Sequence, residues 1–241
     1  MKIIVSGDYA CFTRSEMKVE RVSYDVPTIS ALEGILKSIY WKPSFRYVIK
    51  KIVVFNPIKF INIRTNEVSD KLSGITAKVK SKNYSELCLY PGECRSQRSS
   101  LVLKDVKYGV EFDIKLTGIC DEREREECGN DTNKSLGKHY DILQRRLVKG
   151  QCYKMPCLGF ASYRADVELV DDFDLSTVDN SFKGRDIDLG YMLYRICFKD
   201  KGLCKGKWSR ESFSDEAYGT YYRPHMVDGV IDVCKYVEEV R

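Results

Sequence analysis

The chain has 241 residues, enough to bury one large core or to divide into a larger and a smaller unit. Its hydrophobic content of 43% and charged content of 31% are typical of a folded globular protein and exclude a disordered one. The formal net charge of +5 is too small to establish a polyanionic partner by itself. No apolar run approaches the ~20 residues of a membrane span, and the N-terminal run is too short for a signal peptide, so we expect a cytoplasmic protein.

The ten cysteines are more than usual and invite a metal or disulfide interpretation. No neighbouring pair has the two-residue spacing with which two thiolates bind one zinc ion. Disulfides do not persist in a reducing cytosol. We therefore expect free thiols, no metal and no cofactor, and a cysteine-based metal or redox protein is the weaker alternative.

A strand and a helix are predicted at the start of the chain. Residues 1–6 are a short apolar strand that ends before Gly7-Asp8. The helix has apolar residues at positions i, i+3, i+4 and i+7, namely Leu32, Ile35, Leu36 and Ile39. Its cap is either Ser30, in a capping box with Glu33, or Thr28. Pro43 ends it, because the residue before a proline avoids the helical region.

The middle of the chain predicts two strands, a second helix and a third strand. Residues 46–64 are rich in β-branched and aromatic residues, and residues 106–116 alternate between apolar and polar, which is typical of a half-buried strand. Between them lies a polar, irregular insert at 69–100. Leu136, Tyr140, Leu143 and Leu147 form one stripe of a basic helix at 136–149, and Gly150 ends it. A strand follows near residues 158–170.

This order is β-α-β-β-α-β, so the fold class is α+β, with a ferredoxin-like (RRM-like) domain over residues 1–170. The RRM aromatic signature is missing, so bases are not expected to stack on the sheet. Residues 171–241 hold a strand at 187–198 and a hairpin that turns at Asp228-Gly229, between 221–227 and 230–237. We interpret this region as a small antiparallel β-sheet subdomain.

Lys138 and His139 are the residues whose position most suggests chemistry. RNA carries its own nucleophile, so its cleavage needs acid–base groups and a cation near the phosphate, but no metal. Histidine suits this role because its unperturbed pKa is about 6.5. If His139 lies at the start of the helix, the helix N-terminus and Lys138 both disfavour the imidazolium and keep a neutral base. The alternative is that His139 merely caps a surface helix.

The sequence leaves the roles of Tyr40 and His225 open. Tyr40 continues the apolar stripe of the first helix, so core packing explains it, although its place before Pro43 would let the hydroxyl reach outward. His225 has no evident partner in the sequence and is interpreted as structural or exposed to solvent.

Several clustered motifs resemble one family in order and spacing. They are Gly7-Asp8-Tyr9-Ala10, Ser23-Tyr24-Asp25-Val26-Pro27-Thr28, Ala31-Leu32-Glu33-Gly34-Ile35, Ser38-Ile39-Tyr40-Trp41-Lys42-Pro43, Gly137-Lys138-His139-Tyr140 and Ile142-Leu143-Gln144-Arg145. The family is the CRISPR-associated protein of family five in its type I-C (Dvulg) subtype, a member of the RAMP superfamily. The resemblance is strong over residues 1–64 and good over 101–170.

The resemblance implies a RAMP-type endoribonuclease that cuts CRISPR repeat transcripts (pre-crRNA) by attack of the 2′-hydroxyl. It assigns the catalytic site to Tyr40, Lys138 and His139. It also implies that the protein stays on the crRNA 5′ handle in the type I-C interference complex, beside the backbone and large subunits. The loop after the second helix departs from the family's glycine-rich pattern, with Lys154 as its only cation. The candidate RNA-binding residues are Lys42, Arg145, Arg146, Lys149 and Lys154.

The alternative from a different functional class is a subunit that holds the crRNA handle without cutting RNA. The presence of all three residues of the family's site favours the enzyme.

Overall fold

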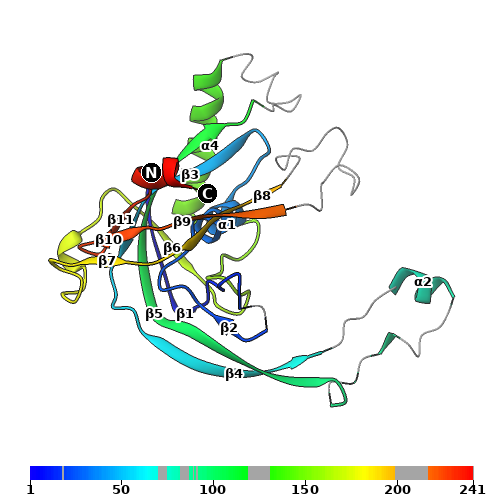
Figure 1. The fold of residues 1–241 in the computed structure, drawn as a ribbon. Helices are drawn as coiled ribbons and strands as arrows, with labels where there is room; N and C mark the ends of the chain where they lie inside the picture. The colour runs from blue at the N-terminus through cyan, green and yellow to red at the C-terminus, as the bar shows by residue number, and fades with distance from the viewer. Residues whose placement is uncertain are drawn as a thin grey trace.

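The computed structural model describes residues 1–17, 19–69, 75–81, 87–88, 90, 92–118, 131–198 and 217–240. The protein is α+β, with one large, mostly antiparallel sheet and a separate two-stranded sheet (Figure 1). The large sheet has the strand order β6-β1-β5-β3-β11-β10-β7, and β2 and β4 pair with β5 outside this path. Among the described residues, no helix combines the length and apolar composition needed to cross a membrane.

The centre of the sheet is formed by β1 (Lys2–Ala10), β3 (Phe45–Val54), β5 (Arg95–Leu116) and β6 (Asp166–Val170). The alternation predicted for residues 106–116 is confirmed, because Tyr108, Val110, Phe112 and Ile114 are all buried in the core. β5 begins eleven residues before this stretch, however, and its first half pairs with a different strand.

The first predicted helix is confirmed as α1 (Ile29–Ile39). Its cap is Thr28, the second of the two alternatives, whose hydroxyl accepts a hydrogen bond from the amide of Ala31 at 3.2 Å. Glu33 is not part of a capping box. Its carboxylate is buried and forms ion pairs with Lys37 one turn later and with Arg195 of β8.

The second helix, α4, runs from Thr132 to Val148, so it begins four residues before the predicted start at 136. Asp131 caps it, because its carboxylate accepts hydrogen bonds from the amides of Asn133 and Lys134 at 2.9 and 3.2 Å. Gly150, at a φ of 62°, follows its C-terminus as predicted. This earlier start changes the surroundings of His139, as described below.

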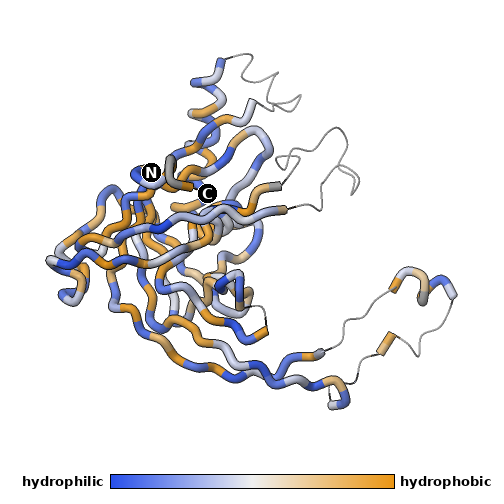
Figure 2. Tube along the Cα trace, viewed as in Figure 1, coloured by the Kyte–Doolittle hydropathy of each residue, from blue (hydrophilic) through white to orange (hydrophobic). Residues whose placement is uncertain are grey.

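The predicted strand at 46–64 is two strands, β3 and β4 (Phe60–Val68), separated by a short segment that contains Pro57. β4 pairs with residues 95–103 of β5, and the two form an arm that extends from the body (Figure 1). Figure 2 shows many hydrophilic residues along this arm. The prediction of an irregular insert at 69–100 was wrong at residues 95–100, which belong to β5, and at α2 (Ile75–Lys80).

The predicted strand at 187–198 is also two strands, β7 (Asp186–Asp188) and β8 (Met192–Phe198), with Gly190 at a φ of 69° between them. β8 pairs with β9 (Ala217–Tyr222) to form the two-stranded sheet, which contacts α1. The shorter elements are β2 (Arg21–Val22) and the 3-10 helices η2 (Leu175–Thr177) and η4 (Val233–Glu239).

The hairpin turn at Asp228-Gly229 is confirmed, with φ values of 52° and 76° that suit a tight two-residue turn. Its strands, β10 (His225–Val227) and β11 (Val230–Asp232), are shorter than predicted. They do not form a small sheet of their own, because β11 pairs with β3 and thereby extends the large sheet. Local sequence patterns could not reveal this pairing of distant segments.

Candidate active site

Tyr40 is the C-cap residue of α1, at the point where the chain leaves the helix for β3. Its backbone is fixed from two sides: its amide donates to the carbonyl of Leu36 at 3.0 Å, and its carbonyl accepts from the hydroxyl of Tyr47 at 2.6 Å. Burial raises the pKa of the Tyr47 hydroxyl, so this hydroxyl remains a donor at neutral pH. The ring of Tyr40 is only 5% exposed, and its hydroxyl is directed inward rather than toward solvent.

His139 of α4 meets Tyr40 inside the protein. The imidazole is 1% exposed, and both ring nitrogens contact hydroxyls. The Tyr40 hydroxyl lies 3.0 Å from Nδ1, and the Ser44 hydroxyl lies 3.2 Å from Nε2. The ring also packs on Phe45, with 4.6 Å between ring centroids. The alternative that His139 caps a surface helix is therefore wrong.

The electrostatic argument for His139 also changes. α4 begins at Thr132, so His139 is the eighth residue of the helix and lies about two turns from its N-terminus. The positive field of a helix N-terminus falls off within the first turn. The helix N-terminus therefore does not act on this imidazole, and the two hydroxyls define its surroundings instead.

Ser44 is a contact residue that sequence reasoning missed. It follows Pro43 directly and is buried, and its segment is fixed to the end of β5 by Thr117. The Thr117 amide donates to the Ser44 carbonyl at 2.9 Å, and the Thr117 hydroxyl donates to the Pro43 carbonyl at 2.7 Å. Its place beside the motif that ends at Pro43 was a signal, but serine is too common for its type alone to suggest a role.

Arg146 has a place that its charge did not predict. It is half-buried, and its guanidinium donates to the carbonyl of Ile39 at 2.6 Å. The same group lies over the Tyr40 ring, with Cζ 5.0 Å from the ring centroid. These contacts hold the end of α1 against α4 and support the ring of Tyr40.

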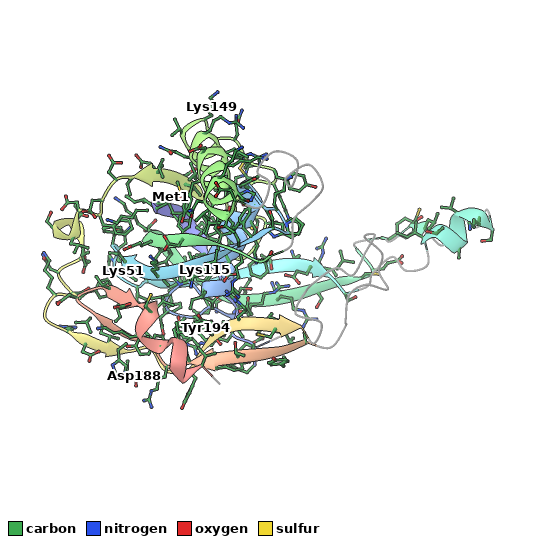
Figure 3. All side chains as sticks on the ribbon, turned by 90° about the horizontal axis from the view of Figure 1, so that it is seen from above. Met1, Lys51, Lys115, Lys149, Asp188 and Tyr194 are labelled. Atoms are coloured by element: carbon green, nitrogen blue, oxygen red, sulfur yellow. The ribbon has the colours of Figure 1, made fainter. Side chains whose placement is uncertain are left out.

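The other candidate cations differ in exposure and in their place along the chain. Lys138 is half-buried and, as the residue before His139, lies about 100° from it around the helix axis. Lys42 is half-buried, whereas Arg145 and Lys149 are exposed on α4. Figure 3 shows Lys149 at the outer end of this helix.

Lys154 belongs to the segment after α4, which is attached to the end of α1. The amides of Tyr153 and Lys154 both donate to the carbonyl of Ser38, at 2.9 and 3.0 Å. Ser38 is two residues before Tyr40. The structure thus brings Tyr40 and His139 into contact and places Lys154 near the same end of α1.

The structure also shows the state of the possible metal ligands, the cysteines and the second histidine. In the part of the chain that the structure describes, no three His, Cys, Asp or Glu residues are grouped closely enough to hold a metal ion. The described cysteines are free thiols. His225 does have a partner, because its Nδ1 lies 2.8 Å from a carboxylate oxygen of Asp186.

The arrangement around His139 can move a proton. A neutral imidazole has one donor and one acceptor nitrogen, and each hydroxyl can donate or accept. A proton taken up at one ring nitrogen can therefore be matched by a proton given from the other. Fold and site together define an α+β protein with a hydroxyl–imidazole–hydroxyl centre and one arginine, Arg146, against its tyrosine ring.

Comparison with known proteins agrees with this description. A family model described as "CRISPR-associated protein (Cas_Cas5)", for the Cas5d group, matches residues 1–234. The chain is 39% identical to the CRISPR pre-crRNA endoribonuclease Cas5d of Mannheimia succiniciproducens, over all of this chain and 98% of that one. It is 36% identical to the protein of the same name from Thermus thermophilus, over 82% of this chain and 73% of that one.

Two solved structures have a similar fold at 23% sequence identity and a TM-score of 0.60 each. One is a crystal structure of a CRISPR-associated protein, matched over 96% of this chain and 89% of that one. The other is the protein SMU1763c from Streptococcus mutans, matched over 95% of this chain and 89% of that one. The family model and the two relatives decide the assignment: the chain belongs to the Cas5d family of CRISPR-associated proteins. This confirms the family indicated by the sequence motifs.

Proposed function

We propose that the protein is a metal-independent endoribonuclease that cuts pre-crRNA within the CRISPR repeat. The observation that carries this proposal is the contact between the Tyr40 hydroxyl and His139 Nδ1, at 3.0 Å, between residues from different halves of the predicted β-α-β-β-α-β unit. Membership of the Cas5d family and the shared name of its two relatives support the same activity. The order β6-β1-β5-β3, with α1 and α4 in the connections, supports a ferredoxin-like RAMP domain at its centre.

In this proposal, the residues of the centre divide the work of one proton-transfer reaction. The base takes the proton of a 2′-hydroxyl, whose oxygen forms a bond to the adjacent phosphorus while the bond from phosphorus to the 5′-oxygen breaks. The acid gives a proton to the departing 5′-oxygen, which leaves a 2′,3′-cyclic phosphate and a 5′-hydroxyl. Tyr40 and His139 supply the acid–base pair, and Lys138 stabilises the charge on the phosphate. The RNA reaches the imidazole by displacing one of its two hydroxyl partners.

After cutting, the protein remains on the crRNA 5′ handle as a subunit of the type I-C interference complex, beside the backbone and large subunits. Lys42, Arg145, Lys149 and Lys154 are the side chains proposed to contact the RNA. Arg146 contributes by supporting Tyr40 rather than by binding a phosphate, because its guanidinium is already engaged within the protein.

The second candidate function is a subunit that holds the handle without cutting. One observation favours it: His139 is 1% exposed and has a hydroxyl at each ring nitrogen, as expected of a histidine with a structural role.

Incubation of the protein with repeat RNA in excess EDTA distinguishes the two functions. Cleavage that persists and yields a cyclic phosphate supports the metal-independent enzyme, and a single 2′-deoxy nucleotide at the mapped cut should then block it. Cleavage that disappears with EDTA and returns with magnesium contradicts the mechanism. Tight binding without any cleavage supports the second candidate.

A further inference from the structure

A cavity of about 390 Å³ lies along α1, the helix that ends at Tyr40, and is not used by the catalytic steps above. One wall is the outer face of α1, from Ser30 to Ser38. Residues 11–13, which follow β1, and residues 154–159, which follow α4, form other walls, and Leu193 of β8 contributes from the two-stranded sheet. Its volume is at the lower end of the range for small-molecule sites, so it has room for about one nucleotide but not for a folded RNA.

The lining of the cavity combines hydrogen-bonding groups, apolar surface and one cation. The hydroxyls come from Thr13, Thr28, Ser30 and Ser38, and the ammonium comes from Lys154. None of the described lining residues is acidic, so nothing in the wall repels an anion. Such a lining fits a ligand with a flat polar base and a phosphate, that is, a nucleotide.

Gly34 gives independent support for a ligand. It is an exposed residue in the interior of α1, where glycine destabilises a helix by roughly 1 kcal/mol relative to alanine. Interior glycines are usually explained by a neighbour that packs too closely for a side chain. Here a Cβ atom at Gly34 would meet no atom within 4 Å. The space above Gly34 is therefore part of the cavity, and no group of the described protein fills it.

The cavity also lies next to the proposed path of the RNA. Ser38, in its wall, is two residues before Tyr40, and its carbonyl receives the amides of Tyr153 and Lys154. These two hydrogen bonds hold the Lys154 segment in the wall of the cavity. The end of α1 that carries Tyr40 is therefore also part of the cavity wall, with the Lys154 segment bound to it.

We propose that this cavity binds one unpaired nucleotide of the repeat RNA, with its base over Gly34 and its phosphate at Lys154. This inference rests on the proposed function, since it assumes that the ligand is the same RNA. The cavity would then contribute to substrate selection, because it accepts one base that is not stacked on its neighbours in the RNA.

The test is a binding cycle with uncleavable repeat RNA that carries 2′-deoxy at the mapped cut. Abasic nucleotides are introduced one at a time on either side of the cut, and dissociation constants are measured for the wild type and for Gly34→Met. Methionine is a better helix former than glycine, so this variant fills the cavity without weakening α1. Gly92→Met is the matched control, because it adds the same side chain at an exposed glycine outside the cavity.

We expect Gly34→Met to raise the dissociation constant for intact RNA by about tenfold, a typical effect of losing one recognised base. One abasic position should have the same effect on the wild type and none on Gly34→Met, whereas Gly92→Met should behave as wild type throughout. The inference is overturned if Gly34→Met binds intact RNA as the wild type does, or if the effects of every abasic position add to that of the substitution. If this coupling is found but cleavage of unmodified repeat RNA by the wild type proves to need a metal, only the proposed catalytic mechanism is contradicted.

Discussion

The hydroxyl of Tyr40 and Nδ1 of His139 are 3.0 Å apart, although the two residues are separated by 99 positions in the chain. Tyr40 ends α1 and His139 lies in the middle of α4, so their contact depends on how the two helices pack on the sheet. The hydroxyl of Ser44, the residue before β3, contacts the other ring nitrogen. Three separate elements thus fix the orientation of one imidazole, and each can be tested alone.

Replacement of His139 separates chemistry from binding. His139→Ala removes the proton-transfer group but leaves the surrounding cations, so the cleavage rate should fall roughly 10²–10⁴-fold while the affinity for repeat RNA changes little. Single-turnover cleavage and equilibrium binding measure the two effects. His225→Ala is the control, because this second histidine lies on β10 and pairs with Asp186. Equal cleavage by the two variants would falsify the assignment of His139.

The two hydroxyls at the imidazole should differ in importance. Tyr40→Phe keeps the packing of the ring and removes only the hydroxyl at Nδ1, so cleavage should slow by at least tenfold if this hydroxyl transfers or directs a proton. Ser44→Ala removes the hydroxyl at Nε2 and should have a smaller effect, since its role is to orient the ring. Rates for both variants, with thermal unfolding to exclude a loss of fold, give the comparison. A larger effect of Ser44→Ala would transfer the catalytic role to Nε2.

The cations of α4 should divide into two kinds. Arg145 and Lys149 are exposed, so a double substitution to methionine should weaken RNA binding and reduce the log–log salt slope by about 0.7 for each lost phosphate contact. Arg146→Met should leave that slope unchanged but slow cleavage, because Arg146 supports Tyr40. Titrations over a range of salt concentrations test both parts. A reduced slope for Arg146→Met would mean that it binds a phosphate after all.

The ion pair between Glu33 and Arg195 should stabilise the fold. The Glu33 carboxylate is 6% exposed, and Arg195 attaches the two-stranded sheet to α1. Removing one partner of a buried pair destabilises a protein by about 3–5 kcal/mol, and Lys37 remains as a second partner, so Arg195→Met should lower the free energy of unfolding by roughly 1–3 kcal/mol.

Chemical denaturation of Arg195→Met can be compared with that of Arg223→Met, which breaks a more exposed pair with Asp188. The exposed pair should contribute about 0–1 kcal/mol. If the two variants unfold alike, the pair at Glu33 does not hold the two-stranded sheet on α1.

Much of the fold could be predicted because its elements have strong local patterns. The face of α1 and the alternation in β5 follow from burial on one side of each element, which the sequence records directly. The start of α4 was missed because polar residues precede its apolar stripe, and only the capping contacts of Asp131 show where the helix begins.

The two principal residues of the site could be predicted from the sequence, but the residues that surround them could not. Tyr40 and His139 lie in distinctive motifs, whereas Ser44 and the inward position of Arg146 depend on contacts between elements far apart in the sequence. A charged side chain gives no sign in the sequence of whether it faces solvent or a neighbouring ring. The cavity beside Gly34 has no local signal either, because four separate segments form its walls.

The pairing of β11 with β3 has a consequence for how the protein is made. Residues 51–53, which continue the strand that begins beside Ser44, pair with residues 230–232. A ribosome completes the first group long before the second, so the nascent chain carries β3 with one edge unpaired through most of its synthesis. Unpaired strand edges favour association with other chains, and contacts between distant residues form slowly. Chaperone dependence and the yield of soluble protein should therefore be sensitive to changes in β11, a strand far from the chemistry.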